Sequence, residues 1–314
     1  MNINQLKYFV SLYRLRNFSK AASELQISQP ALSLQIQKLE EEFGYHLVER
    51  HVKPLGITPE GELFFEKAVQ IIQMVNELDQ LSLELEEEIE GQIRIGIIPT
   101  LSPYLTPLVI QQAQQQYPGL KIEIVELVTE DILKKLTFNE LDAGIVSTPI
   151  KASNVGFKPL FYEQFYLYVA ENHPLYSQAR IKQHEVPADQ LWYLTEGNCF
   201  QNQVNSLCTI PSFDAVSYPF RYVSSSIESL KRIVESQGGL TFIPELATLN
   251  VPSEYEDLVK RLEAPVPYRE ISLVYLKSTG EKKLVKAFTE VILDTIPKRM
   301  KKKPSVTAPL DTKL

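Results

Sequence analysis

The chain contains two cysteines, Cys199 and Cys208, which lie nine positions apart. Nine helical residues rise about 13.5 Å and turn about 900°, so the two side chains would point to opposite sides of a helix. A disulfide needs Cα atoms roughly 4.4–6.8 Å apart. Bonding the two sulfurs would therefore unwind the segment between them, which is how a switch behaves. The spacing is equally consistent with two separate free thiols that pack as small apolar side chains.

The composition is that of an acidic chain with two or three compact units. The chain has 314 residues, of which 44% are hydrophobic, and a net charge of −7. The hydrophobic fraction is sufficient for well-packed hydrophobic cores. The negative net charge argues against non-specific coating of nucleic acid. No apolar run approaches the roughly 20 residues that span a bilayer, and we expect no secretory leader and a cytoplasmic location. In that reducing compartment a disulfide would be transient or sensory.

Residues 4–43 have the periodicity of three short helices. A tight turn at 26–28 precedes the third helix, which Ser28 can cap through its hydroxyl and which has Pro30 in its first turn. Gly44 is placed to end it. This order predicts a helix-turn-helix whose third helix enters the DNA major groove.

The polar side chains of this module suit double-stranded DNA. Glutamine and serine can donate and accept at base edges, and lysine suits phosphate. Residues 45–57 follow as an extended hairpin, the wing, and residues 1–57 carry seven Lys or Arg against five acids, a modest positive footprint. The candidate DNA contacts are Ser28, Gln29, Pro30, Ser33, Gln35, Gln37, Lys38, Arg50 and Lys53.

A long helix is predicted to begin with Thr58 as its cap and Pro59 in its first turn. It carries an apolar stripe, and a stripe without a partner in its own small domain is typical of pairing with another chain. We therefore expect a homodimer. The stripe comprises Leu63, Ala68, Ile71, Ile72, Val75, Leu78, Leu81 and Leu85.

Beyond residue 91, strands alternate with helices, which is typical of an open, mostly parallel sheet. The predicted strands are 92–98, 120–127, 143–147 and 269–275, with further strands in the Phe- and Tyr-rich run 157–170. The predicted helices are 104–116, 129–138 and 282–293.

The order of these segments resembles that of the LysR-type transcriptional regulators. The resemblance is most specific over residues 1–65 and extends from Ile95 to Leu293. It implies a winged helix-turn-helix, a linker helix for dimerisation and a two-lobed α/β regulatory domain like that of periplasmic binding proteins. The motif residues are Phe18, Ser19, Lys20, Ala21, Ala22, Leu25, Ser28, Gln29, Pro30, Ala31, Leu32, Ser33, Ile36, Lys38, Leu39, Glu40, Gly44, Leu47, Glu49, Arg50, Thr58 and Gly61.

The expected domains follow from this layout. They are the DNA-binding domain 1–58, the linker helix 59–90, lobe I from 91–162 and 268–297, lobe II from 163–267, and a disordered basic tail 298–314.

Within the family, the regulatory half is similar to the peroxide-sensing OxyR branch. The likeness rests on segments 97–105, 194–199 and 238–244, together with the nine-residue spacing of the cysteines. It implies that Cys199 is the peroxidatic thiol and Cys208 the resolving thiol. The implied peroxide pocket comprises Thr100, Thr129, Asn198 and Arg269. Two positions depart from the branch, because Asn198 replaces a usual histidine and Gln37 replaces a common arginine.

Peroxide oxidises a thiolate, so we expect Cys199 to have a lowered pKa. A position at the opening of a helix would supply orphan backbone N–H groups and the positive end of the helix dipole. Hydroxyls of Thr100 and Thr129 could hold the peroxide oxygens, and Cys208 would trap the sulfenic acid as a disulfide. Each threonine also has a plainer interpretation, Thr100 as a loop or cap residue and Thr129 as a helix N-cap.

Closing the disulfide would force residues 200–207 to repack. Moving Phe200 and Leu207 between environments is worth about 1.5–3 kcal/mol each. We therefore hypothesise that oxidation shifts dimer contacts between regulatory domains and respaces the recognition helices on DNA.

Two other functions stay open at this point. A LysR-type regulator could bind a small organic effector between its lobes through Thr100, Ser102 and Thr129, with the cysteines incidental. A two-cysteine thiol peroxidase is the alternative from another class, although it leaves the DNA-binding module unexplained. We expect a regulator rather than an enzyme, without metal or cofactor. The expected partners are promoter DNA, further copies of the chain as a dimer or tetramer, hydrogen peroxide and RNA polymerase, with no membrane.

Overall fold

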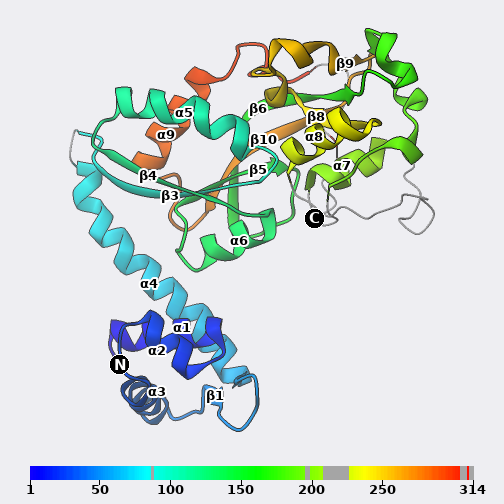
Figure 1. Cartoon of the computed structure of the whole chain (residues 1–314). Coiled ribbons are helices and arrows are strands. Elements are labelled where there is room, and N and C mark those ends of the chain that lie inside the picture. Colours follow the sequence, from blue (N-terminus) through cyan, green and yellow to red (C-terminus); the bar gives the residue numbers. More distant parts are fainter. Residues whose placement is uncertain (86–87, 195–198, 208–225, 305–309, 311–314) are drawn as a thin grey trace. The chain divides into compact units, whose positions relative to one another are not determined.

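The chain divides into two units, Met1–Glu87 and Glu88–Leu314, which are described separately (Figure 1). The structure is a computed structural model that describes residues 1–85, 88–194, 199–207, 226–304 and 310.

The first unit begins with the three predicted helices, α1 (Ile3–Leu15), α2 (Phe18–Glu24) and α3 (Gln29–Phe43). Each starts at a side-chain cap, and the predicted cap of α3 is confirmed because the Ser28 hydroxyl accepts from the Ala31 N–H at 3.3 Å. Gly44 ends α3 with a φ of 81°, which a residue without Cβ adopts at little cost. The apolar side chains of this small core include Phe9, Leu12, Leu32, Ile36 and Leu39.

The wing and the long helix follow as predicted. Strands β1 (Val48–Glu49) and β2 (Gly56–Ile57) pair antiparallel, and α4 spans Pro59–Leu85. The Thr58 hydroxyl accepts from the Gly61 N–H at 3.0 Å and donates to the His46 carbonyl at 2.7 Å. The cap of α4 therefore also anchors the start of the wing.

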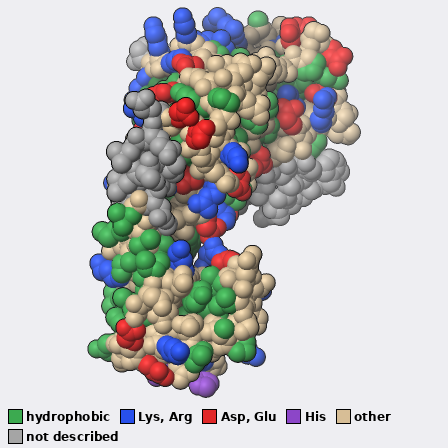
Figure 2. Space-filling view, turned by 90° about the vertical axis from the view of Figure 1, so that its left-hand side faces the viewer, with side chains coloured by type: hydrophobic (Ala, Val, Ile, Leu, Met, Phe, Trp, Pro, Cys, Tyr) green, Lys and Arg blue, Asp and Glu red, His purple; other side chains and the backbone are tan. Residues whose placement is uncertain are grey.

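Large apolar side chains on α4 remain exposed within this chain. Figure 2 shows hydrophobic side chains at the surface of the first unit. Among the α4 side chains that the structure describes, the exposed large apolar ones are Leu63, Ile71, Met74 and Leu78. Ala68, which was expected on the same stripe, packs inward. Since the predicted homodimer needs an uncovered apolar face, α4 provides a suitable surface for it.

The second unit is built on one mixed sheet. Its strands are β3 (Gly91–Ile97), β4 (Leu120–Glu126), β5 (Ala143–Thr148), β6 (Val155–Val169), β7 (Arg180–Ile181), β8 (Leu240–Pro244), β9 (Val259–Leu262) and β10 (Tyr268–Leu276). The order is β4-β3-β5-β10-β6-β9-β7, with β8 also paired to β6.

The expectation of a mostly parallel sheet is wrong. Strand β3 runs parallel to β4 and β5, but β10 pairs antiparallel with both β5 and β6. The physical reason is that β10 returns from the far part of the chain and enters the sheet between two strands that the sequence alone did not show to be neighbours.

Two hydrophobic clusters form in this unit, and β6 contributes to both. Phe161 belongs to the cluster around β3, β5 and α9, whereas Phe165 belongs to the cluster around β8 and α8. The α-helices are α5 (Ser102–Gln116), α6 (Thr129–Thr137), α7 (Cys199–Leu207), α8 (Ile227–Gln237) and α9 (Lys283–Thr295). Short 3-10 turns are η1 (Pro174–Ser177), η2 (Gln183–Glu185), η3 (Ala188–Gln190), η5 (Glu245–Thr248) and η6 (Ser253–Leu258).

The expectation of a disordered tail from residue 298 is wrong for its first residues. Met300 is buried, and its carbonyl accepts from the Tyr162 N–H at 2.8 Å. Arg299 pairs with Glu245 at 2.7 Å, and the Leu310 N–H donates to the Tyr268 carbonyl at 3.0 Å.

Within the described ranges, no helix is long and apolar enough to cross a membrane.

Candidate functional site

A buried thiol lies where two helices of the second unit begin. Cys199 is the first residue of α7 and is 4% exposed. Its Sγ lies 3.0 Å from the hydroxyl oxygen of Thr129, the first residue of α6. The N-cap position of α6 is Val128, so the interpretation of Thr129 as an N-cap is wrong. Its hydroxyl meets the sulfur instead.

Arg269 and Thr100 form the second part of the site. Arg269 lies on β10 and is fully buried. Its Nη1 donates to the Thr100 hydroxyl oxygen at 2.9 Å, and its Nη2 donates to the Thr100 carbonyl at 3.2 Å. Thr100 lies in the loop between β3 and α5. Its interpretation as a loop residue is therefore compatible with its contact with Arg269.

Glu163 is a site residue that the sequence analysis missed. It lies on β6, directly opposite Arg269 in the register of β6 and β10. Its Oε2 accepts from the Arg269 Nε at 2.8 Å and lies 2.7 Å from Nη2, while its Oε1 accepts from the Leu246 N–H at 3.0 Å. A carboxylate within the Phe- and Tyr-rich run 157–170 was the available signal, because a buried charge needs a partner.

Phe200 covers the guanidinium. The Arg269 Cζ lies 5.1 Å from the centroid of the Phe200 ring, within the range of a cation–π contact. Phe200 also stacks on Phe165, with centroids 5.0 Å apart. The residue that follows Cys199 is therefore part of the packing that holds Arg269.

The electrostatics of Cys199 differ from the expectation. Burial raises the pKa of the Cys199 thiol, and this effect outweighs the Thr129 hydrogen bond and the positive charge of Arg269, which both lower that pKa. The nearby Glu130 carboxylate raises the same pKa further. The predicted lowering of the Cys199 pKa is thus wrong for this arrangement.

The segment that separates the two cysteines is helical as far as it is described. Leu207 ends α7 and packs, half-buried, against the second hydrophobic cluster. The buried side chain of Gln203 donates to the Ser147 hydroxyl at 3.1 Å and to the Leu310 carbonyl at 3.0 Å. Asn198 and Cys208 lie outside the described residues.

Apart from Arg50, the DNA-binding candidates of the first unit fall into two groups. Ser28, Gln29, Pro30, Gln37, Lys38 and Lys53 belong to exposed positions. Ser33 and Gln35 are half-buried, and the Gln35 side chain accepts from the Gln5 side chain at 3.3 Å. The side chains of the first group are therefore the more accessible to an external partner such as DNA.

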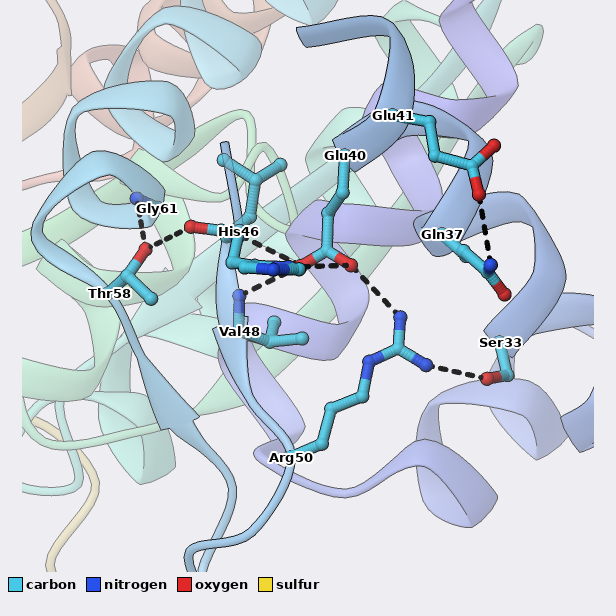
Figure 3. A network of polar contacts seen from close by, with 10 residues as sticks. Ser33, Gln37, Glu40, Glu41, His46, Val48, Arg50, Thr58 and Gly61 are labelled. Atoms are coloured by element: carbon cyan, nitrogen blue, oxygen red, sulfur yellow. Dashed lines mark hydrogen bonds and ion pairs between the residues drawn. The ribbon is translucent and has the colours of Figure 1, made fainter. Parts of the chain in front are cut away.

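Arg50 ties the wing to the recognition helix. Its Nη2 donates to Glu40 at 3.0 Å and its Nη1 donates to the Ser33 hydroxyl at 3.1 Å (Figure 3). Glu40 is buried and also accepts from the backbone N–H groups of Leu47 and Val48, at 2.8 and 3.2 Å. Contact of Arg50 with DNA stays a prediction, and its intramolecular role is structural.

The two units together define a transcription regulator, with a winged helix-turn-helix unit and an α/β unit that carries a buried cysteine site. The family model "Bacterial regulatory helix-turn-helix protein, lysR family" matches residues 3–62, and "LysR substrate binding domain" matches residues 86–297. The chain belongs to the LysR family of DNA-binding transcription regulators.

Several known proteins are similar over most of the chain. The hydrogen peroxide-inducible genes activator of Haemophilus influenzae is 32% identical over 275 residues, covering 88% of this chain and 90% of its own length. The dual regulator OxyR of Escherichia coli is 34% identical over 278 residues, covering 88% and 89%. A full-length OxyR variant from Pseudomonas aeruginosa superimposes with a TM-score of 0.75 at 29% identity, covering 93% of this chain and 94% of that one.

Proposed function

We propose that this regulator senses hydrogen peroxide through a reversible disulfide between Cys199 and Cys208. The supporting observation is the 3.0 Å contact of the buried Cys199 sulfur with the Thr129 hydroxyl. Arg269, which donates to the Thr100 hydroxyl, lies close enough to the Cys199 sulfur for its positive charge to lower the pKa of that thiol. The names of the similar proteins, which describe hydrogen peroxide-inducible activators, point to the same signal.

The reaction oxidises Cys199 by two electrons. The thiolate attacks one peroxide oxygen, the O–O bond breaks, and the departing hydroxide takes a proton and leaves as water. The sulfenic acid that results is then attacked by the Cys208 thiolate, which displaces a second hydroxide and forms the S–S bond. Threonine hydroxyls and the Arg269 guanidinium would hold the peroxide oxygens during the first step.

Disulfide closure requires part of α7 to unwind. Cys199 and Leu207 are the two ends of a nine-residue helix, and Cys208 follows directly. Phe200 would then leave Phe165 and Arg269, a change worth about 1.5–3 kcal/mol in lost burial. A coupling of about 1–3 kcal/mol changes an affinity 5–150-fold, enough to alter contacts between protomers and respace the recognition helices on DNA.

Intact-mass analysis after mild peroxide tests this proposal. We expect the wild type to lose about 2 Da, the two hydrogens given up in a disulfide, and neither Cys199→Ser nor Cys208→Ser to do so. A wild type that keeps both free thiols would overturn the redox proposal and favour an organic effector. Every hydroxyl which that alternative would use has a partner inside the chain, since Ser102 contacts Thr106 at 3.4 Å and the two threonines contact Arg269 and Cys199.

The remaining assignments rest on the same proposal. The regulator would act in the cytoplasm on promoter DNA, as a homodimer or homotetramer, with RNA polymerase as a further partner. Sustained turnover of peroxide with a thiol reductant, rather than one oxidation for each chain, would identify a thiol peroxidase instead.

A further inference from the structure

The orientation of Arg269 depends on one carboxylate. Arginine has five N–H donors in a rigid planar fork, and Glu163 takes the Nε and Nη2 edge while Thr100 takes Nη1. Both oxygens of Glu163 accept from N–H groups, which is the arrangement of an ionised carboxylate. Burial raises the pKa of Glu163, and the charge and hydrogen bonds of Arg269 act against that effect.

We propose that Glu163 is a positioning residue for the peroxide reaction, which holds the Arg269 guanidinium so that Nη1 meets the Thr100 hydroxyl. This inference rests on the proposed function. A hydroxyl has a single hydrogen to donate, and the Thr100 oxygen already accepts from Arg269. Its own hydrogen is therefore directed to another acceptor, such as a peroxide oxygen beside Cys199.

Stability alone is a weak explanation for this pair. Glu163 and Arg269 are both completely buried, and replacing a buried ion pair by apolar residues is often neutral or stabilising. Glu163 is itself fixed at two points, by its position in β6 and by the Leu246 N–H. A rigid carboxylate is what is needed to keep a long, flexible side chain in one orientation.

Glu163 also balances the positive charge near the thiol. The charged groups that act on Cys199 are Arg269, which favours the thiolate, and Glu130, which opposes it. Those that act on Glu163 are Arg269 and Glu245. Removing the Glu163 charge would leave Arg269 less neutralised, so the thiol would ionise at lower pH while the guanidinium loses its orientation.

The test compares Glu163→Gln with the matched control Asp142→Asn in the full-length protein. Asp142 is also nearly buried, with 12% of its side chain exposed, and is also paired with a cation, Lys282, at 2.8 Å. It is not among the charged groups named above as acting on Glu163 or Cys199. The rate of Cys199 oxidation by hydrogen peroxide is measured by stopped flow as a function of pH, after near-UV circular dichroism has confirmed the fold.

For Glu163→Gln we expect the limiting rate at high pH to fall about tenfold and the apparent thiol pKa to fall as well, whereas Asp142→Asn should match the wild type. In an Arg269→Gln background, Glu163→Gln should have no further effect. If Glu163→Gln does not fold, Glu163→Asp replaces it, with a slower limiting rate and no fall in the thiol pKa.

Distinct results separate the two ideas. A wild type that forms the disulfide while the Glu163 variants react at its rate and pH would overturn the positioning role alone, as would additive effects of Glu163→Gln and Arg269→Gln. A wild type that never reacts with peroxide would instead overturn the proposed function.

Discussion

The hydroxyl oxygen of Thr129 lies 3.0 Å from the sulfur of Cys199, and each residue is the first of its helix. The contact joins the openings of α6 and α7, so the thiol lies beside a hydroxyl group that can donate to it once it is ionised. Because 70 positions separate the two residues, the sheet and its crossover connections bring them together.

Removing this hydroxyl should slow oxidation. Thr129→Val keeps the shape of the side chain but cannot donate to the thiolate, a hydrogen bond worth about 1.5–3 kcal/mol. We expect the rate constant for peroxide at neutral pH to fall about 10–100-fold, as measured by stopped flow. Thr289→Val is the control, because Thr289 is equally buried but donates to the Val285 carbonyl in α9. Equal rates for both variants would exclude a role for the Thr129 contact.

The reaction should accelerate with pH. Burial raises the pKa of Cys199 above its ordinary value of 9.0, and the reactive species is the thiolate. Below the folded-state pKa, each unit of pH should therefore increase the rate about tenfold. Alkylation by iodoacetamide from neutral to alkaline pH measures this, with Cys199→Ser as the blank. A rate that is already constant at neutral pH would contradict a raised pKa.

Glu40 should be essential for the fold of the DNA-binding unit. It is buried and accepts from two backbone N–H groups and from Arg50, so Glu40→Ala leaves buried donors unpaired. We expect a loss of about 3–5 kcal/mol in the free energy of unfolding, measured by urea denaturation. Glu41→Ala is the control, since Glu41 is exposed on the same helix, and it should change stability by less than about 0.5 kcal/mol.

Lys38 should contribute affinity without sequence preference. It is exposed on α3, where an ammonium group can neutralise a phosphate. We expect Lys38→Ala to weaken binding to specific and unrelated duplexes alike and to reduce the slope of log K against log salt by about 1. Fluorescence anisotropy at several salt concentrations measures both quantities. A loss confined to the specific duplex would indicate base contact instead.

Dimerisation should depend on the exposed apolar side chains of α4. Leu78 is 66% exposed, and a charge in its place would be desolvated in any helix pair. We expect Leu78→Glu to shift the protein toward monomers in analytical ultracentrifugation. Gln70→Glu is the control, because Gln70 is a polar exposed residue of the same helix. An unchanged assembly in Leu78→Glu would place the interface elsewhere.

Local sequence patterns were sufficient to predict where several helices of this protein begin and end. The Ser28 cap, Pro30 in the first turn and Gly44 at the end define α3 because each acts on backbone groups within a few residues. Thr58 and Pro59 begin α4 for the same reason. Capping and periodicity are short-range effects, so the sequence alone was sufficient for these elements and for the start of α7 near Cys199.

Tertiary structure decided what depends on distant neighbours. The antiparallel entry of β10 places Arg269 opposite Glu163, and no local pattern specifies that register. The same packing buries Cys199, which raises its pKa where the helix opening alone predicted a lower one. Desolvation depends on everything that surrounds a group. The sequence was therefore enough to select Cys199 as the candidate reactive thiol, but the direction of its pKa shift depended on the folded chain.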